Sequence, residues 1–294
     1  MSDNIAQDER DTPDAGTRPV SIITGGAGGM GVATAEILGR DHTVVLADVR
    51  AERLDAAVAA LSDLGITATP VVCDVTEEKA VEELFDVASG LGVIASVIHT
   101  AGVSPSMGDA DYVMRTNVLG TLHVGEVFYR RAHPDAALVN VASMAAHLLP
   151  VEAVPSQHFP TALRDQDAFL AEMAAICGAV PEEARSGYAY AIGKSFVKWY
   201  SESQAERFNG RHLRIVSVSP GSIETEMGKL EAEAGAGAMV ADFAVPRWGK
   251  PEEMAALFAF AASPAAGYLT GTDILADGGV VASMRERARV AAQG

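Results

Sequence analysis

The feature that most constrains the fold of this chain is a repeated alternation between short apolar runs and segments of helical periodicity. The apolar runs lack the polar alternation of half-exposed strands, so we expect strands buried on both faces, as in a parallel sheet between helices. Seven strands are expected, at Val20–Thr24, Thr43–Ala47, Pro70–Cys73, Ala95–His99, Ala137–Ala142, Leu213–Ser219 and Asp273–Ala276. Helices are expected at Gly29–Leu38, Arg50–Leu61, Glu77–Ser89, 109–132, Tyr188–Phe208 and Pro251–Ala262. The sequence therefore predicts an α/β protein with a doubly wound, seven-stranded parallel sheet.

Two segments are longer than the connections of a compact α/β domain, which usually span about 2–6 residues. We expect an insertion over 146–187, in which Asp165–Cys177 shows helical spacing. The insertion is interpreted either as a helix packed on its own domain or as a lid over the active site. Residues 222–246 are expected to form a mobile substrate loop, because long loops at the carboxyl ends of strands commonly bind ligands. The expected boundaries are a disordered N-terminal tail at 1–18, one domain at 19–282 and a C-terminal tail at 283–294.

The charge balance is strongly acidic, with 22 Lys and Arg against 39 Asp and Glu and a formal net charge of −17. Such a charge repels phosphate backbones and anionic lipids, so binding to nucleic acid or to a membrane surface is not expected. The sequence has no apolar run long enough for a membrane span, and its polar N-terminus lacks the layout of a signal peptide, which favours the cytoplasm. Cys73 and Cys177 have no neighbours at zinc-binding spacing, so we expect reduced thiols and no metal site.

A glycine-rich stretch, T-G-G-A-G-G-M-G at Thr24–Gly31, follows the first expected strand and opens the first helix. Such a turn lets the backbone approach a pyrophosphate, whose charge is stabilised by free N–H groups and the helix dipole. It is typical of Rossmann-type domains, although glycine spacing alone also fits an ordinary tight turn. Asp48 ends the second strand and is placed to accept hydrogen bonds from a ribose 2′-OH, which favours NAD over NADP. Alternatively, Asp48 only caps the next helix, and Arg50 keeps NADP as the less favoured cofactor.

Further motifs follow along the chain. They are Asp74-Val75, His99-Thr100-Ala101-Gly102, Asn117, Ser143, Tyr190-Ala-Ile-Gly-Lys194, Pro220-Gly221-Ser-Ile223-Glu-Thr225 and Asp277-Gly278-Gly279. With Thr24–Gly31 placed before them, this ordered set resembles the short-chain dehydrogenase/reductase family and spans residues 20 to about 280. The long insertion before Tyr190 is similar to that of bacterial hydroxysteroid dehydrogenase and carbonyl reductase members of the family.

The resemblance implies a nicotinamide cofactor and a defined set of site residues. The cofactor-binding residues that it implies, with Asp48 added from the argument above, are Thr24, Gly25, Gly29, Met30, Gly31, Asp48, Asp74, Val75, Ala101, Gly102, Tyr190, Lys194, Pro220, Gly221, Ile223 and Thr225. The catalytic residues are Ser143, Tyr190, Lys194 and Asn117. The resemblance also implies a homodimer or a homotetramer.

Tyr190 is the expected proton donor and acceptor beside the carbon that exchanges hydride with nicotinamide. A phenol has an ordinary pKa near 10, so a cation is needed to stabilise its phenolate. Lys194 lies one helical turn later on the same face and is expected to lower the pKa of Tyr190 by about 2–3 units. The alternative is an exposed pair without a function. Tyr188 is disfavoured because it lies on a different helical face from Lys194.

Ser143 and Asn117 complete the expected catalytic group. By resemblance, Ser143 orients the substrate oxygen and Asn117, a poor helix former at mid-helix, holds a water that links Lys194 to solvent. The alternatives are a strand-end turn serine and an ordinary buried amide. Two features depart from the family pattern. His99 stands where the family usually has Asn and is interpreted as supporting the sheet, and Ser143 lies unusually far from Tyr190 in sequence.

These residues predict an NAD-dependent oxidoreductase that interconverts a secondary alcohol and a ketone on an apolar substrate such as a steroid, with Tyr190 as general acid and base. One alternative is a non-catalytic cofactor-binding regulator or scaffold of the same fold, which need not retain all four catalytic residues. Another is a Rossmann-type methyltransferase, which predicts neither a Tyr-Lys pair nor a strand-end serine at these points.

Overall fold

A seven-stranded sheet forms the centre of the molecule. A computed structural model of the chain describes residues 18–234 and 244–293. All strands of this sheet are parallel, in the order β3-β2-β1-β4-β5-β6-β7. Their bounds are β1 Val20–Thr24, β2 Thr43–Asp48, β3 Ala68–Val72, β4 Ile94–His99, β5 Ala137–Val141, β6 Arg214–Pro220 and β7 Asp273–Ala276. The predicted doubly wound, seven-stranded parallel sheet is confirmed.

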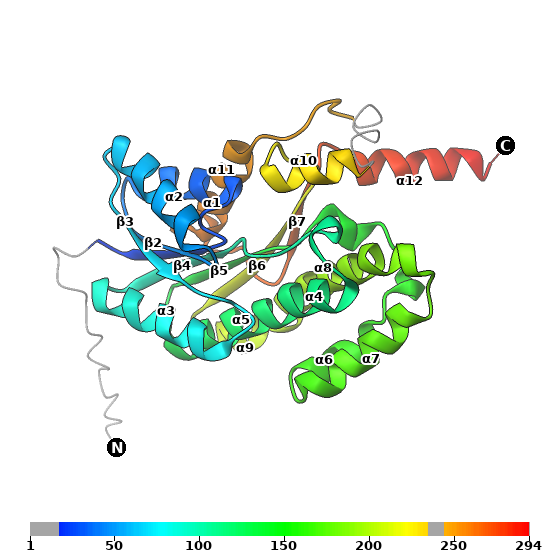
Figure 1. The fold of residues 1–294 in the computed structure, drawn as a ribbon, viewed down its shortest axis with the longest axis horizontal. Coiled ribbons are helices and arrows are strands. Elements are labelled where there is room, and N and C mark those ends of the chain that lie inside the picture. The colour runs from blue at the N-terminus through cyan, green and yellow to red at the C-terminus, as the bar shows by residue number, and fades with distance from the viewer. Residues whose placement is uncertain (1–17, 235–243, 294) are drawn as a thin grey trace, which may run out of the picture.

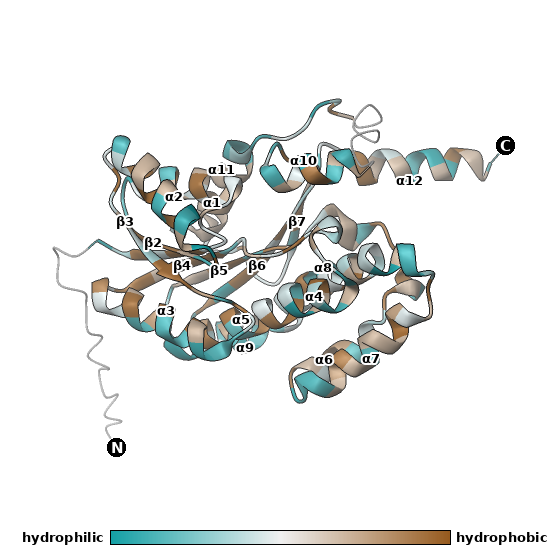
Figure 2. Cartoon of the chain, viewed as in Figure 1, coloured by the Kyte–Doolittle hydropathy of each residue, from teal (hydrophilic) through white to brown (hydrophobic). Residues whose placement is uncertain are grey.

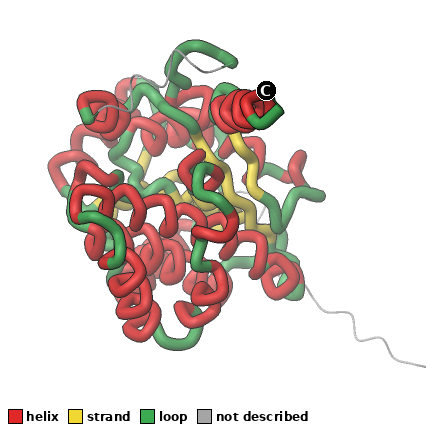
Figure 3. Tube along the Cα trace, turned by 90° about the vertical axis from the view of Figure 1, so that its right-hand side faces the viewer, coloured by secondary structure: helices red, strands yellow, loops and turns green. Residues whose placement is uncertain are grey.

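Helices cover both faces of this sheet (Figures 1 and 3). One face carries α1 (Gly29–Leu38), α2 (Ala51–Asp63) and α11 (Pro251–Ala262). The other face carries α3 (Glu78–Leu91), α4 (Ala110–Met114), α5 (Gly120–Arg131), α8 (Arg185–Ser203) and α9 (Ala205–Asn209). The remaining helices are α6 (Phe159–Ala162), α7 (Gln166–Gly178), α10 (Glu226–Glu233) and α12 (Val280–Ala291). In the part of the chain that the structure describes, none of the helices combines the length and apolarity needed to cross a membrane.

The sheet divides the apolar core into two clusters, one against each helical layer. Strands β1, β5 and β6 contain only buried residues, which explains why their sequences show no polar alternation. Figure 2 shows the apolar strands between helices whose outer faces are polar. Strand β3 alternates between buried and more exposed residues because it is an edge strand, and this position also tolerates Pro70, which has no N–H to donate.

Two expected helices are interrupted. The helix expected over 109–132 is divided into α4, a π-helical turn at Arg115–Leu119, and α5. Within this turn the carbonyl of Asn117 accepts a hydrogen bond from the Thr121 hydroxyl at 2.8 Å. The helix expected over 188–208 begins earlier, at Arg185, and separates into α8 and α9 at Gln204.

The C-terminal residues differ from the tail that was expected at 283–294, because most of them belong to α12. The carboxylate of Asp277 accepts hydrogen bonds from the backbone N–H groups of Gly279 and Val281, both at 2.8 Å, and so fixes the turn that opens this helix. Val280 and Val281 are buried, which anchors its first turn. The N-terminal tail expected at 1–18 lies outside the described residues except for Arg18.

The insertion before Tyr190 has a helical part and a proline-containing part. Helix α7 contacts α4 and α8, and the rings of Phe159 and Phe169 are fully buried, with centroids 5.4 and 5.7 Å from that of Phe196. The helical part therefore belongs to the core on this side of the sheet. The proline-containing part reaches α8 through the Tyr188 hydroxyl, which donates to the carbonyl of Ala153 at 3.0 Å.

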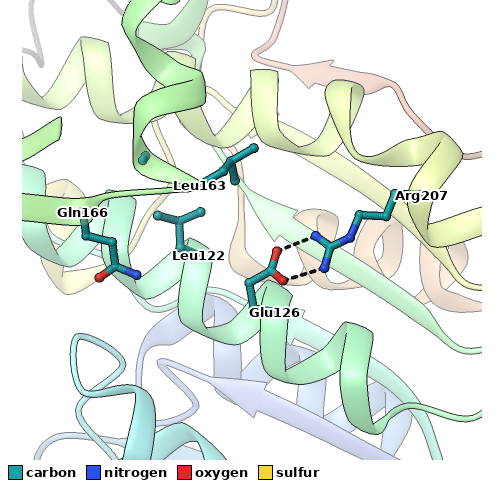
Figure 4. Close-up of a pocket in the computed structure, with 6 residues that line it drawn as sticks. Leu122, Glu126, Leu163, Gln166 and Arg207 are labelled. Atoms are coloured by element: carbon teal, nitrogen blue, oxygen red, sulfur yellow. Dashed lines mark hydrogen bonds and ion pairs between the residues drawn. The ribbon is translucent and has the colours of Figure 1, made fainter. Parts of the chain in front are cut away.

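A cavity of about 240 Å³ lies between α5, α6 and α9 (Figure 4). One side of it is closed by Glu126 and Arg207, whose carboxylate and guanidinium are joined by two hydrogen bonds of 2.7 Å. The hydroxyl of Tyr200 donates to the same carboxylate at 3.0 Å. None of the site residues predicted from the sequence lines this cavity, so the functional site must be sought at the carboxyl ends of the strands.

Candidate active site

The strand order reverses between β1 and β4, and open α/β sheets bind ligands beside such a switch point. The glycine-rich turn lies here. Gly25 has a φ of +62°, and a Cβ at this position would lie 2.8 Å from the backbone N of Ala101, in the turn after β4. A Cβ at Gly31 would lie 2.4 Å from the carbonyl oxygen of Gly25. The turn thus closes only because Gly25 and Gly31 lack side chains, and its shape and position fit the phosphates of a dinucleotide.

Polar side chains fasten the turn after β1 to the turn after β4. The hydroxyl of Thr24 is 2.7 Å from Nδ1 of the buried His99, and the hydroxyl of Thr100 donates to the Thr24 carbonyl at 2.7 Å. Burial lowers the pKa of His99 to about 3, and the nearby charge of Lys194 contributes in the same direction. His99 is therefore neutral and supports the sheet, which agrees with the interpretation drawn from its sequence position.

Asp48 stands at the end of β2, half-buried, and one of its oxygens accepts a hydrogen bond from the backbone N of Arg50 at 3.3 Å. Arg53, one turn into α2, is directed instead to Glu226 at the start of α10, at 2.7 Å, and to the carbonyl of Ala27 at 3.5 Å. This ion pair links α2 and α10 beside the glycine-rich turn.

Asp74 and Val75 follow β3. Asp74 is exposed, and one of its oxygens accepts hydrogen bonds from the backbone N and the hydroxyl of Thr76. Val75 is buried, and its carbonyl oxygen is 3.0 Å from Nδ1 of His123. Of these two side chains, that of Asp74 is therefore the one that is accessible for a polar contact with a ligand.

The segment after β6 closes against the glycine-rich turn. Pro220 is buried, Gly221 N donates to the carbonyl of Ala276 at 3.1 Å, and Ile223 is buried against the core of the α1 face. The Thr225 hydroxyl caps α10 by accepting from the backbone N of Gly228. A Cβ at Gly29 would lie 3.1 Å from the Thr225 methyl group, and Met30 follows Gly29 in the first turn of α1. The turns after β1, β4 and β6 therefore meet at the carboxyl edge of the sheet, with Asp48 at the end of β2 and Asp74 just after β3.

Lys194 is buried in α8 and donates from Nζ to the carbonyl of Val141, at the end of β5, at 2.9 Å. Burial lowers its pKa to about 8. A Cβ at Gly102 would lie 3.3 Å from this Nζ and 2.7 Å from Oδ1 of Asn117. The side-chain amide of Asn117 is held by the N and O of Val103, at 3.2 and 3.0 Å. Lys194, Asn117 and Gly102 are thus close neighbours.

Tyr190 lies one turn before Lys194 on α8, with the lysine Nζ 5.8 Å from its ring centroid. The expected lowering of its pKa is wrong for this structure. Burial raises the pKa of Tyr190, a hydrogen bond with Ser143 opposes this shift, and the charge of Glu231 reinforces it. The physical reason is that Nζ of Lys194 is turned toward the carbonyl of Val141. Ser143, the residue before the 3₁₀ turn Met144–His147, therefore meets Tyr190 despite their separation in sequence.

A polar cluster around Asp273, which includes His147 in the turn after Ser143, was not predicted from the sequence. Nε2 of His147 is 2.8 Å from the carboxylate of Asp273, which is almost fully buried at the start of β7. Asp273 also accepts hydrogen bonds from Ser217 and Ser219 on β6, at 2.6 and 3.0 Å. These hydrogen bonds, and that of His147, hold the pKa of Asp273 below its usual range although burial opposes them. The only available signal in sequence was a histidine four residues after Ser143.

Comparisons with known proteins agree with this geometry. The family model described as short chain dehydrogenase matches residues 19–155, and that described as enoyl-(acyl carrier protein) reductase matches residues 156–281. A cis-4-hydroxycyclohexanecarboxylate dehydrogenase from Sinomonas cyclohexanicum is 31% identical over 266 residues, which cover 90% of this chain and 96% of that protein. The chain belongs to the short-chain dehydrogenase/reductase family.

Other members of the short-chain dehydrogenase/reductase family are also similar. A 3-oxoacyl-[acyl-carrier-protein] reductase from Thermotoga maritima is 27% identical over 273 residues, covering 89% of this chain and 97% of that protein. The solved structure of a short-chain dehydrogenase/reductase from Serratia marcescens superposes with a TM-score of 0.72 at 22% identity, over 90% of this chain and 98% of the other. The protein is thus an oxidoreductase of a family that uses NAD(P) and acts on alcohols and ketones.

Proposed function

We propose that this enzyme interconverts a secondary alcohol and a ketone with NAD, and that Tyr190 is its general acid and base. The observation that carries the proposal is the convergence of Tyr190, Ser143 and Lys194 at the end of β5, beside Gly102 and near the glycine-rich turn. The nicotinamide, when bound, supplies or accepts the hydride. Side chains of this protein orient the substrate, transfer the proton and stabilise the charge that develops.

Each of the four catalytic residues has a separate task in this proposal. The Ser143 hydroxyl orients the substrate oxygen toward Tyr190. The phenol donates a proton to this oxygen in reduction and removes it in oxidation. The Lys194 ammonium stabilises negative charge at the phenol when the proton has left. Asn117 fixes the backbone at Val103 and forms the wall of the site next to Lys194, where the proposed water link to solvent begins.

The preference for NAD rests on Asp48, whose carboxylate stands at the end of β2 and would repel a 2′-phosphate. Its hydrogen bond to Arg50 leaves one oxygen for a ribose hydroxyl. Arg53 is occupied by Glu226, which removes a second cation from the 2′-phosphate position. We therefore propose that NADPH binds more weakly than NADH.

The substrate class and the setting of the enzyme are further proposals. An apolar, steroid-like alcohol or ketone is proposed from the insertion, whereas similar relatives are named for acyl-carrier-protein thioesters and a hydroxycyclohexanecarboxylate. A homodimer or homotetramer in the cytoplasm is proposed from the family resemblance. Sedimentation at equilibrium tests the assembly, since each chain contributes 30.6 kDa.

The test of the proposed function uses purified wild-type protein and its Asp48→Asn variant. Nicotinamide fluorescence gives the dissociation constants of NADH and NADPH, and NADH consumption is then followed with a panel of cyclic ketones. We expect tighter binding of NADH by the wild type, a smaller difference in the variant, and turnover of at least one ketone. Equal or stronger NADPH binding would remove the role of Asp48, and the absence of turnover over the whole panel would contradict the proposed reaction.

A further inference from the structure

The carboxylate of Glu231 joins α10 to the 3₁₀ turn at Pro105–Met107. The side chain of Glu231 is half-buried, and its Oε1 accepts a hydrogen bond from the backbone N of Ser106 at 3.2 Å. Ser106 lies in the 3₁₀ turn Pro105–Met107, which follows β4. Helix α10 begins at the glycine-rich turn, where Thr225 approaches Gly29. Helix α10 thus extends from the glycine-rich turn to the Pro105–Met107 turn.

The Pro105–Met107 turn is itself attached to α8, the helix that carries Tyr190. The Ser186 hydroxyl donates to the carbonyl of Gly108 at 2.9 Å, and the turn contacts α8. Ser186 precedes Tyr190 by one turn on α8. The Pro105–Met107 turn therefore connects α8, one helical turn before Tyr190, with α10 and the carboxylate of Glu231.

Among the residues that the structure describes, Glu231 has no ion-pair partner. In the described ranges 18–234 and 244–293, its hydrogen bond to Ser106 is its one polar contact, and no Lys or Arg forms an ion pair with it. Its charge reaches the reaction centre, since it raises the pKa of Tyr190 in addition to the larger effect of burial. The net charge of −17 adds to the negative field around the site.

We infer that Glu231 is a specificity-determining residue that excludes anionic substrates, so that the enzyme takes alcohols and ketones that are uncharged or cationic beyond the reacting carbon. The inference rests on the proposed function. A carboxylate or phosphate on the substrate would be held near an unpaired carboxylate in a partly desolvated site, and such like-charge contacts oppose binding. An amide or hydroxyl of the same shape would instead donate a hydrogen bond to the free oxygen of Glu231.

The test compares two ketones of nearly identical shape, 4-oxocyclohexanecarboxylate and 4-oxocyclohexanecarboxamide. Each is reduced with NADH by wild-type enzyme, by Glu231→Gln, which keeps the oxygen that accepts from Ser106, and by Glu233→Gln as a control. Glu233 lies on the same helix but is exposed. We expect kcat/KM of the wild type for the carboxylate to be at least about tenfold below that for the amide, equivalent to about 1.4 kcal/mol. Glu231→Gln should remove most of this difference through KM, and Glu233→Gln should retain it.

A second measurement does not depend on turnover. The Tyr190→Phe protein saturated with NADH is titrated with both ketones, and binding is followed by the nicotinamide fluorescence. Weaker binding of the carboxylate than of the amide, removed by adding Glu231→Gln, supports the inference even if neither ketone is reduced. Equal binding of the two ketones, or the same discrimination in Glu231→Gln, overturns it. Binding of neither ketone overturns it as well, whereas binding of the amide without reduction by the wild type counts against the proposed reaction alone.

Discussion

Burial of the Lys194 ammonium, which the proposed reaction requires, lowers the free energy of unfolding of the protein. Its ammonium is buried and donates a hydrogen bond to the Val141 carbonyl, and burial lowers its pKa from 10.5 to about 8. Above pH 8 the folded protein has released this proton, while the unfolded chain still binds it up to pH 10.5. Stability must therefore rise with pH across this window and is lowest below it. The site thus keeps a charged group where an apolar one would stabilise the fold.

A Lys194→Met variant separates this contribution from those of other titrating groups. We expect the free energy of unfolding of the wild type to rise by about 3 kcal/mol relative to the variant between pH 8 and pH 10.5. Denaturant unfolding of both proteins at several pH values in this range, without cofactor, measures the difference. A constant difference across the range would show that the lysine is not desolvated in the folded protein.

Gly102 is the second residue whose substitution is informative. A methyl group there would lie 2.7 Å from Oδ1 of Asn117 and 3.3 Å from Nζ of Lys194, so it must displace one of them. We expect Gly102→Ala to lower kcat about tenfold or more, because small displacements of catalytic groups are costly. Gly90→Ala is the control, since a Cβ at Gly90 has open space in α3. Equal kcat values for the two variants would contradict the close approach at Gly102.

Individual residues were predictable only where local spacing carried the signal. The spacing of Tyr190 and Lys194 on one helical face distinguished Tyr190 from Tyr188, whose hydroxyl is occupied by Ala153 in the structure. Glu231 and the pair of His147 and Asp273 could not be found in this way. Their contacts join segments more than a hundred residues apart, and no local pattern encodes such a meeting.

At the scale of elements, expected strands agreed closely with the structure because each is a short buried run with a clear end. Helix interruptions were harder to predict. The π-helical turn at Arg115–Leu119 depends on the bond from Thr121 to the carbonyl of Asn117 and on the close approach of α8 at Gly193, whose Cβ would lie 3.4 Å from that of Asn117. Residues 283–294 were expected only as a C-terminal tail, because their charged sequence contains few large apolar residues and Met284 and Val290 are exposed.

The packing of α7, the main helix of the insertion, against the domain can be tested by mutation. Because Phe169 of α7 is fully buried against Phe196, we expect Phe169→Ala to lower the free energy of unfolding by about 3–5 kcal/mol. Phe260→Ala on α11, where the side chain is 50% exposed, should cost far less. Denaturant unfolding monitored by circular dichroism compares the two variants. Similar losses would mean that α7 is only loosely attached to the domain.

For the whole molecule, the alternation of buried apolar runs with helical segments was sufficient to predict the architecture. Most of the motifs directly follow a strand, and the carboxyl ends of parallel strands meet at one edge of the sheet, whereas Asn117 and Tyr190–Lys194 lie on helices. This rule brings Thr24, His99, Ser143 and Pro220 to the same edge although they are spread over two hundred residues. It does not determine side-chain directions, which is why the hydrogen bond from Nζ of Lys194 to the Val141 carbonyl was not predicted.

In the proposed reaction, Tyr190 transfers the proton to and from the substrate oxygen. The most direct test is the steady-state turnover of a ketone with NADH by Tyr190→Phe, with Tyr188→Phe as the matched control that loses only the hydrogen bond to Ala153. We predict that kcat falls by about 10²-fold or more in Tyr190→Phe, that the dissociation constant of NADH changes little, and that Tyr188→Phe stays close to the wild type. Unchanged turnover in Tyr190→Phe would contradict the account.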